Sequence, residues 1–102
     1  MARILVVDDE QAARLGMRKV LERAGFDVLE ATDGPGALES VRRDAPEIVL
    51  LDVNIPGPDG LEVLRRISGG PDAPLVIMIT AYGSERMAAE AIKQGAYDYI
   101  PK

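Results

Sequence analysis

The fold is decided near the N-terminus by Ile4-Leu5-Val6-Val7-Asp8-Asp9-Glu10, in which four apolar residues run directly into three acids. An apolar run of this length without polar alternation is typical of a strand buried on both faces of a parallel sheet. Two further runs have the same character, Ile48-Val49-Leu50-Leu51 and Leu75-Val76-Ile77-Met78-Ile79. Val28-Leu29 and Tyr97-Asp98-Tyr99-Ile100 are weaker strand candidates, expected near the edge of the sheet.

Amphipathic stretches fill the gaps between these strands, with apolar residues at the spacing of a helix face. Gly25 and Gly95 are expected to end the first and the fourth helix, and Ser84 to cap the start of the fourth. The predicted inward residues are Ala13, Met17, Val20, Leu21 and Ala24 in the first helix, Ala37, Leu38 and Val41 in the second (Gly36 to Asp44), Leu61, Leu64 and Ile67 in the third, and Ala88, Ala91 and Ile92 in the fourth.

Strand and helix therefore alternate along the whole chain and end in a fifth strand. This alternation predicts a doubly wound α/β domain, with right-handed crossovers and helices on both faces of a parallel sheet. The length of 102 residues fits one domain, and an apolar content of 47% argues against disorder. Periodicity alone leaves the order of the strands open.

The composition excludes several classes of site. A net charge of −5 disfavours direct binding to nucleic acid or to an anionic membrane. The chain has no cysteine and no histidine, so disulfides, thiolate metal sites and histidine catalysis are excluded. It shows neither a secretory signal nor an apolar stretch near the ~20 residues of a transmembrane helix, so a cytoplasmic protein is expected.

Reactive polar residues follow the strongest strands. The first strand ends in Asp8-Asp9-Glu10, the third in Asp52, the fourth in Thr80, and the fifth is followed by Lys102. A single polar residue here would only mark where a strand reaches solvent. Because ligands of open parallel sheets bind beyond the carboxyl ends of the strands, four such positions on one edge predict a functional site.

The chemistry of this edge points to a phosphoryl group. Two carboxylates 4 Å apart repel by ~4 kcal/mol at an effective dielectric of 20, so the cluster must take up protons or a cation. Oxygen ligands suit a hard divalent ion, above all Mg²⁺. Such an ion beside the hydroxyl of Thr80 and the ammonium of Lys102 would make a phosphoryl pocket, in which a carboxylate can act as the nucleophile.

With these motifs the sequence resembles the receiver domains of two-component response regulators. The resemblance covers essentially the whole chain and implies a flavodoxin-like sheet with strand order 2-1-3-4-5. The segments that carry it are Ile4 to Glu10, Leu51-Asp52-Val53-Asn54-Ile55-Pro56-Gly57-Pro58-Asp59-Gly60, Ile79-Thr80-Ala81, and Gly95-Ala96-Tyr97-Asp98-Tyr99-Ile100-Pro101-Lys102.

The resemblance implies a phosphoacceptor and its cofactor. Asp52 would accept a phosphoryl group from the phosphohistidine of a sensor histidine kinase, in a reaction that needs Mg²⁺ or Mn²⁺. Asp9 would bind the metal directly, as would Asp52 and the backbone carbonyl of Asn54, while Asp8 would hold a metal-bound water. Glu10 is interpreted as a solvated residue at a helix start rather than as a ligand.

The resemblance also implies a switch. Thr80 would be the hydroxyl that moves to the phosphoryl group, Lys102 the cation paired with it, and Tyr99 the aromatic residue that turns inward, although Tyr99 could be an ordinary edge-strand residue. Asn54 and Tyr82 flank the pocket and are predicted to set the lifetime of the phosphorylated state. The Pro56 to Gly60 segment is interpreted as loop geometry only.

The chain departs from the family pattern at its end. Receiver domains normally continue into a fifth helix, so residues 1–102 resemble a receiver domain truncated before that helix, unless the helix is disordered or supplied by another chain. Apolar sheet surface would then be uncovered, and we expect self-association through it or through the face of the fourth helix and fifth strand. A C-terminal output domain, absent here, would control transcription.

Three other functions share this topology. A non-phosphorylated interaction module would keep only the fold, a flavin-binding domain would need a phosphate cradle after the first strand, and an aspartyl-phosphate phosphatase would need an acid where Asn54 stands. The acidic loop after the first strand argues against a flavin. The expected protein is a phosphoacceptor signalling domain, not an enzyme beyond its own phosphotransfer and dephosphorylation.

Overall fold

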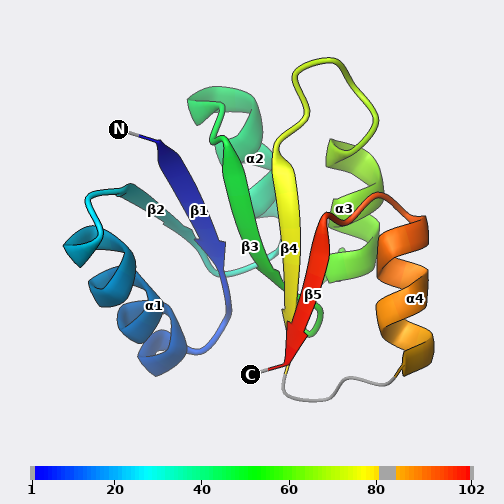
Figure 1. Ribbon diagram of the computed structural model, residues 1–102, viewed down its shortest axis with the longest axis horizontal. Helices are drawn as coiled ribbons and strands as arrows, with labels where there is room; N and C mark the ends of the chain where they lie inside the picture. The colour runs from blue at the N-terminus through cyan, green and yellow to red at the C-terminus, as the bar shows by residue number, and fades with distance from the viewer. Residues whose placement is uncertain (1, 81–84, 102) are drawn as a thin grey trace.

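A computed structural model describes residues 2–80 and 85–101 of the chain. Within these residues strand and helix alternate as the sequence predicts (Figure 1). The elements are β1 (Arg3–Val7), α1 (Gln11–Arg23), β2 (Asp27–Ala31), α2 (Gly34–Asp44), β3 (Ile48–Asp52), α3 (Gly60–Ile67), β4 (Leu75–Thr80), α4 (Glu85–Lys93) and β5 (Asp98–Pro101).

The strands form one parallel sheet in the order β2-β1-β3-β4-β5, which confirms the predicted topology. In the register Ile4 lies opposite Val28 on one side and Ile48 on the other, and Asp52 lies opposite Ile79. All strands point the same way, so their carboxyl ends share the lower edge of the sheet in Figure 1.

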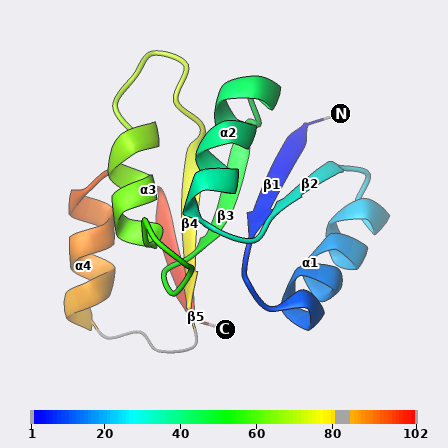
Figure 2. The ribbon, with the colours of Figure 1, turned by 180° about the vertical axis from the view of Figure 1, so that it is seen from behind.

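The main core lies between the sheet and three helices. α2, α3 and α4 cover one face of the sheet, and α1 lies on the opposite face (Figures 1 and 2). Alternate strand residues point into the three-helix layer, as pleating requires. The largest fully buried apolar side chains of this core are Leu5, Val7, Val49, Leu51, Val63, Leu64, Val76 and Met78.

The opposite face is only partly covered. α1 and the sheet enclose a shallow apolar groove lined by Gly16, Met17, Val20, Leu21, Leu50, Ile79 and Ile100. Val20 is 67% exposed and Ile100 is 45% exposed. Apolar sheet surface therefore lies open on this face, as expected for a receiver-like sheet with four helices.

Two predicted helix faces were wrong in part. No residue of α1 is buried, and Val20 and Ala24 of its predicted inner stripe are exposed, because this helix packs alone against a half-covered sheet. Ile92 of α4 is also exposed, whereas Ala91 is fully buried. Ser84, the predicted cap of α4, lies outside the described residues.

Several element boundaries also differ from the predictions. β2 runs from Asp27 to Ala31 rather than over two residues, because it pairs with all five residues of β1. α2 begins at Gly34 rather than Gly36, since the Asp33 side chain caps it by accepting from Gly36 N at 2.7 Å. Gly25 and Gly95 do follow the ends of their helices, with φ of 95° and 115°.

Candidate functional site

Three adjacent strands bring polar side chains to the carboxyl edge of the sheet. Asp8 directly follows β1, Asp52 ends β3 and Thr80 ends β4. All three are buried, with exposures of 0%, 6% and 0%. Buried carboxylates are costly unless a partner compensates the charge, so their presence at one edge marks a site rather than a solvent boundary.

The acidic side chains converge as the sequence predicts. Asp8, Asp9 and Asp52 each offer a carboxylate oxygen, and these atoms lie within 4.8 Å of one another. Asp9 is exposed, whereas the other two are buried. Three hard oxygen donors with one side open to solvent fit a divalent cation such as Mg²⁺ that keeps part of its water shell. The residues present therefore fit the expected metal.

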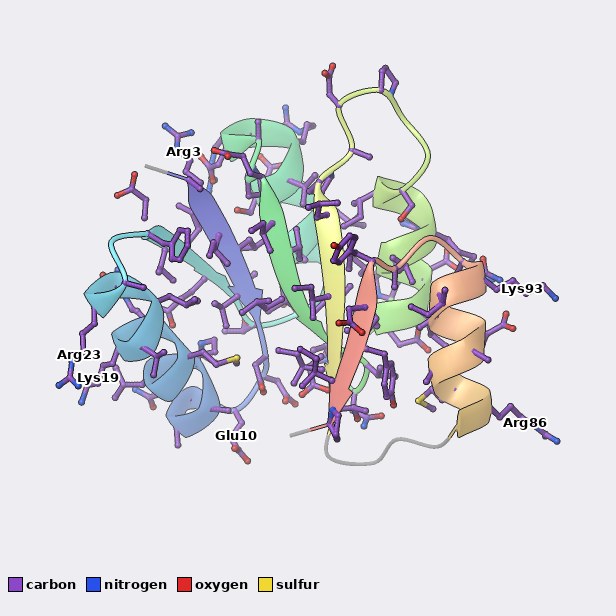
Figure 3. All side chains as sticks on the ribbon, in the orientation of Figure 1. Arg3, Glu10, Lys19, Arg23, Arg86 and Lys93 are labelled. Carbon is purple, nitrogen blue, oxygen red and sulfur yellow. The ribbon has the colours of Figure 1, made fainter. Side chains whose placement is uncertain are left out.

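The loop after β1 is held by hydrogen bonds that two main-chain N–H groups donate. Asp8 N donates to the carbonyl oxygen of Ala31 at 3.2 Å, and Glu10 N donates to Asp8 Oδ1 at 2.9 Å. Glu10 itself points away from the sheet edge into solvent (Figure 3). Glu10 is the N-cap residue of α1, which agrees with its predicted place at a helix start and outside the acidic cluster.

Asn54 joins the phosphoacceptor candidate to the next strand. Its main-chain N–H donates to Asp52 Oδ1 at 3.0 Å, and its Nδ2 donates to Thr80 Oγ1 at 3.4 Å. The side chain of Asn54 is exposed at the mouth of the site. The sequence predicted a role for the carbonyl of Asn54, but it gave no sign of the side-chain bond to Thr80.

The loop after β3 needs close backbone packing at its end. A Cβ on Gly60 would lie 2.4 Å from the carbonyl oxygen of Asp52, so no other residue fits without a shift. Asp59 caps α3 by accepting from Glu62 N at 3.0 Å. Gly34 N donates to the carbonyl oxygen of Pro56 at 3.1 Å, which fastens the loop to α2. These contacts agree with a role in loop geometry.

Tyr99 on β5 packs against the main core. Its hydroxyl is buried without a hydrogen-bond partner among the residues that the structure describes, and burial raises its pKa. The phenol of Tyr99 therefore faces inward, and its role as the switch aromatic stays a prediction. Lys102 and Tyr82, the other two predicted site residues, lie outside the described residues.

Sequence reasoning missed Arg14. Its Nη1 donates to the carbonyl oxygen of Asp8 at 2.9 Å, and its Nε lies 3.2 Å from Glu30 Oε1. Arg14 lies between Ala13 and Met17 in the first predicted helix and outside the stripe of predicted inward residues. Only the packing of α1 beside β2 brings it to both partners.

The profile of the response regulator receiver domain matches residues 4–102. The chain belongs to this family. Among curated proteins, the receiver domain is 45% identical over 101 residues to the response regulator MprA of Mycobacterium leprae, a match that covers 98% of this chain and 44% of the relative. It is 37% identical to the sporulation initiation phosphotransferase F of Bacillus subtilis, covering 98% of this chain and 81% of the relative.

Solved structures agree with this assignment. The receiver domain superposes with a TM-score of 0.89 on the BeF3-activated N-terminal receiver domain of RstA from Klebsiella pneumoniae, at 28% identity over 98% of this chain and 85% of the other. NtrX from Brucella abortus gives a TM-score of 0.90 at 38% identity, with coverage of 99% and 24%.

The receiver domain spans less than half the length of the MprA relatives that it matches. The similarity to these longer proteins therefore concerns only the part of each relative that matches this chain. Within the described residues, no helix has both the length and the apolar character that crossing a bilayer requires.

Proposed function

We propose that this receiver domain is a cytoplasmic phosphorylation switch in which Asp52 accepts a phosphoryl group from a sensor histidine kinase. The observation that carries the proposal is the convergence of three carboxylates within 4.8 Å, one of them the buried Asp52. Asp9, Asp52 and the carbonyl of Asn54 would hold Mg²⁺ or Mn²⁺, with Asp8 holding a metal-bound water. A bound divalent ion supplies charge neutralisation for the phosphoryl oxygens.

In the transfer Asp52 supplies the carboxylate nucleophile. An oxygen of Asp52 attacks the phosphorus of the phosphohistidine, the P–N bond breaks, and the imidazole leaves and takes up a proton, while an acyl phosphate forms on Asp52. The N–H of Asn54, 3.0 Å from Asp52 Oδ1, orients the attacking carboxylate. Lys102 would pair with a phosphoryl oxygen after transfer.

The conformational response starts at Thr80. In the structure the Thr80 hydroxyl oxygen accepts a hydrogen bond from Asn54, and in the phosphorylated state its O–H would donate to the phosphoryl group. Charge-assisted hydrogen bonds are stronger than neutral ones, so phosphorylation favours the moved hydroxyl. Tyr99 would then turn further inward, and the surface of α4 and β5 would change shape for an output that controls transcription.

A second candidate function is supported by one relative. The protein that this chain matches at 37% identity over 81% of its length is named a phosphotransferase. In that role the acyl phosphate on Asp52 would pass its phosphoryl group to a histidine of a further protein rather than act on an output. Incubating the phosphorylated chain with candidate histidine-containing partners and following loss of the phosphoryl group distinguishes the two roles.

The central proposal is tested with a small phosphodonor. Acetyl phosphate and Mg²⁺ should add one phosphoryl group, seen in the intact mass, and both Asp52→Asn and EDTA should prevent it. Phosphorylation retained in Asp52→Asn would place the acceptor elsewhere. An unmodified wild-type chain would favour the interaction module, and an absorbance spectrum with flavin bands would identify the flavin-binding alternative.

A further inference from the structure

We infer that Arg14 is a positioning residue for the metal site, because its guanidinium holds the loop that carries Asp8 and Asp9. The inference rests on the proposed function, since it concerns the same acidic pocket. It adds a residue that bonds to the main chain of the loop rather than to the carboxylates that would bind the ion.

Arg14 makes two bonds that tie separate segments together. Its Nη1 donates to the carbonyl oxygen of Asp8 at 2.9 Å, and its Nε donates to Glu30 Oε1 on β2 at 3.2 Å. The Arg14 side chain is only 15% exposed, so water competes little for these bonds. One planar guanidinium therefore fixes the end of β1 relative to the edge strand β2.

The start of α1 does little to fix the loop before it. Glu10, the N-cap of α1, makes no side-chain bond to the helix, the first turn contains no acidic residue, and no residue of α1 is buried. A helix start without these features is poorly fixed by local sequence. The N–H of Asp8 supplies one tie, to the carbonyl oxygen of Ala31, which is the neighbour of Glu30 on β2. Arg14 adds a side-chain tie from α1 to Asp8 as well.

The charge of Arg14 makes the inference easy to test. A cation beside an acidic pocket repels a metal ion, so on Coulombic grounds alone its removal should tighten metal binding. A positioning role predicts the opposite, because the loop would lose the bond that presents Asp8 and Asp9 together. The two explanations therefore differ in sign.

Arg18 provides a matched control on the same helix. It lies one turn beyond Arg14 and pairs with the same Glu30 and also with Glu22, but it makes no bond to the loop among those that the structure describes. Arg18→Met thus removes an equal positive charge and a bond to Glu30, while the bond from Arg14 to Asp8 stays. A difference between the two variants reports the loop contact.

The experiment is a Mn²⁺ titration followed by electron paramagnetic resonance, with metal-free thermal unfolding of each variant measured in parallel. Arg14→Met should weaken Mn²⁺ binding by ~10-fold, the effect typical of residues that orient metal ligands. Arg14→Lys keeps the positive charge but cannot make both bonds of the guanidinium, so it should also weaken Mn²⁺ binding. It replaces Arg14→Met in the titration if that variant folds poorly. Arg18→Met should bind Mn²⁺ as the wild type does.

Two results would overturn this inference and leave the proposed function standing. One is an Arg14 variant that binds Mn²⁺ at least as tightly as the wild type, and the other is an equal loss of Mn²⁺ affinity in Arg18→Met. A wild-type chain that binds no Mn²⁺ would instead remove the proposed function, and the inference with it. The wild-type titration therefore tells the two failures apart.

Discussion

The amide of Asn54 lies 3.4 Å from the hydroxyl oxygen of Thr80, so the residue two places beyond Asp52 contacts the end of the neighbouring strand. The main-chain N–H of the same residue donates to Asp52 Oδ1 at 3.0 Å. Asn54 therefore stands between the proposed phosphoacceptor and the proposed switch hydroxyl, and it is bonded to both.

This contact should resist the switch. If Thr80 moves away from Asn54 to reach a phosphoryl group, this bond breaks, and a hydrogen bond of this length contributes ~0.5 kcal/mol. Asn54→Ala should therefore switch at a lower concentration of acetyl phosphate. The concentration at which half of the Thr80 amide signal in NMR spectra has moved to its phosphorylated position should fall by about twofold. An unchanged or higher midpoint would show that the bond does not oppose the switch.

Tyr82 is predicted to shield the acyl phosphate from water. Replacing it with alanine should make dephosphorylation severalfold faster, which intact-mass measurements after removal of the phosphodonor can follow. Tyr82→Phe keeps the ring and should retain the wild-type lifetime. If Tyr82→Ala loses its phosphoryl group no faster than the wild type, the shielding role is abandoned.

Gly60 is predicted to be intolerant of any side chain. A Cβ there would meet the carbonyl oxygen of Asp52 at 2.4 Å and Val53 Cα at 2.7 Å, both backbone atoms that cannot rotate away. Gly60→Ala should cost ~1–3 kcal/mol in the free energy of unfolding and weaken Mn²⁺ binding through Asp52.

Gly57 in the same loop is the control for Gly60. A Cβ at Gly57 has no neighbouring atom within 4 Å. Gly57→Ala should change the free energy of unfolding by less than ~0.5 kcal/mol in urea denaturation. Equal losses in the two variants would contradict the close-packing argument.

Tyr99 should make the protein less stable at high pH. Burial raises the pKa of its phenol, so the folded state holds this proton more tightly than the unfolded state. The stabilisation is complete below the ordinary tyrosine pKa of ~10 and is lost as the pH rises through the raised pKa of the folded state. Tyr99→Phe should show a smaller fall in urea midpoint between about pH 9 and about pH 11.

Tyr97 is the matched control for this pH effect. Its side chain is 68% exposed, so Tyr97→Phe should leave the alkaline loss of stability as it is in the wild type. If Tyr99→Phe follows the wild-type pH profile as well, titration of the buried phenol is not its cause.

The open apolar face should drive self-association. Ile100 lies on this face beside Ile79 and is 45% exposed, and contiguous apolar surface of this kind favours contact between chains. Sedimentation equilibrium should detect dimers or larger species, and Ile100→Glu should shift them towards monomer. Ile92→Glu tests the alternative face, since Ile92 is a 48% exposed residue of α4. A wild-type chain that stays monomeric at all concentrations would contradict the prediction.

The sequence predicted the strands well because three of them are continuous apolar runs. Continuous apolar runs leave a strong signal in β1, β3 and β4, although only β1 is buried on both faces, and their polar ends identified Asp8, Asp52 and Thr80 before any geometry was known. The resemblance to receiver domains then supplied the strand order, which no periodicity contains. Convergence of Asp8, Asp9 and Asp52 followed from that order.

What the sequence could not predict depends on tertiary neighbours. Val20 fits a helical stripe, yet it is exposed, because the face of the sheet beside α1 is only half covered. The bonds of Arg14 to Glu30 and of Asn54 to Thr80 leave no local signal, since these partners lie 16 and 26 residues away in the chain. The start of α2 was missed because the Asp33 cap precedes a Gly-Pro-Gly segment that is typical of a turn.

The lack of any buried residue in α1 has a consequence for how the domain opens. Helices with little buried surface detach in partial unfolding events well below the free energy of global unfolding. Fraying of α1 would release the bond from Arg14 to the loop that carries Asp8 and Asp9, while Asp52 stayed on a strand locked into the core. Native-state hydrogen exchange should then find the amides of α1 exchanging ahead of those in α2 and α3, so that the proposed metal site is lost on warming before the fold is.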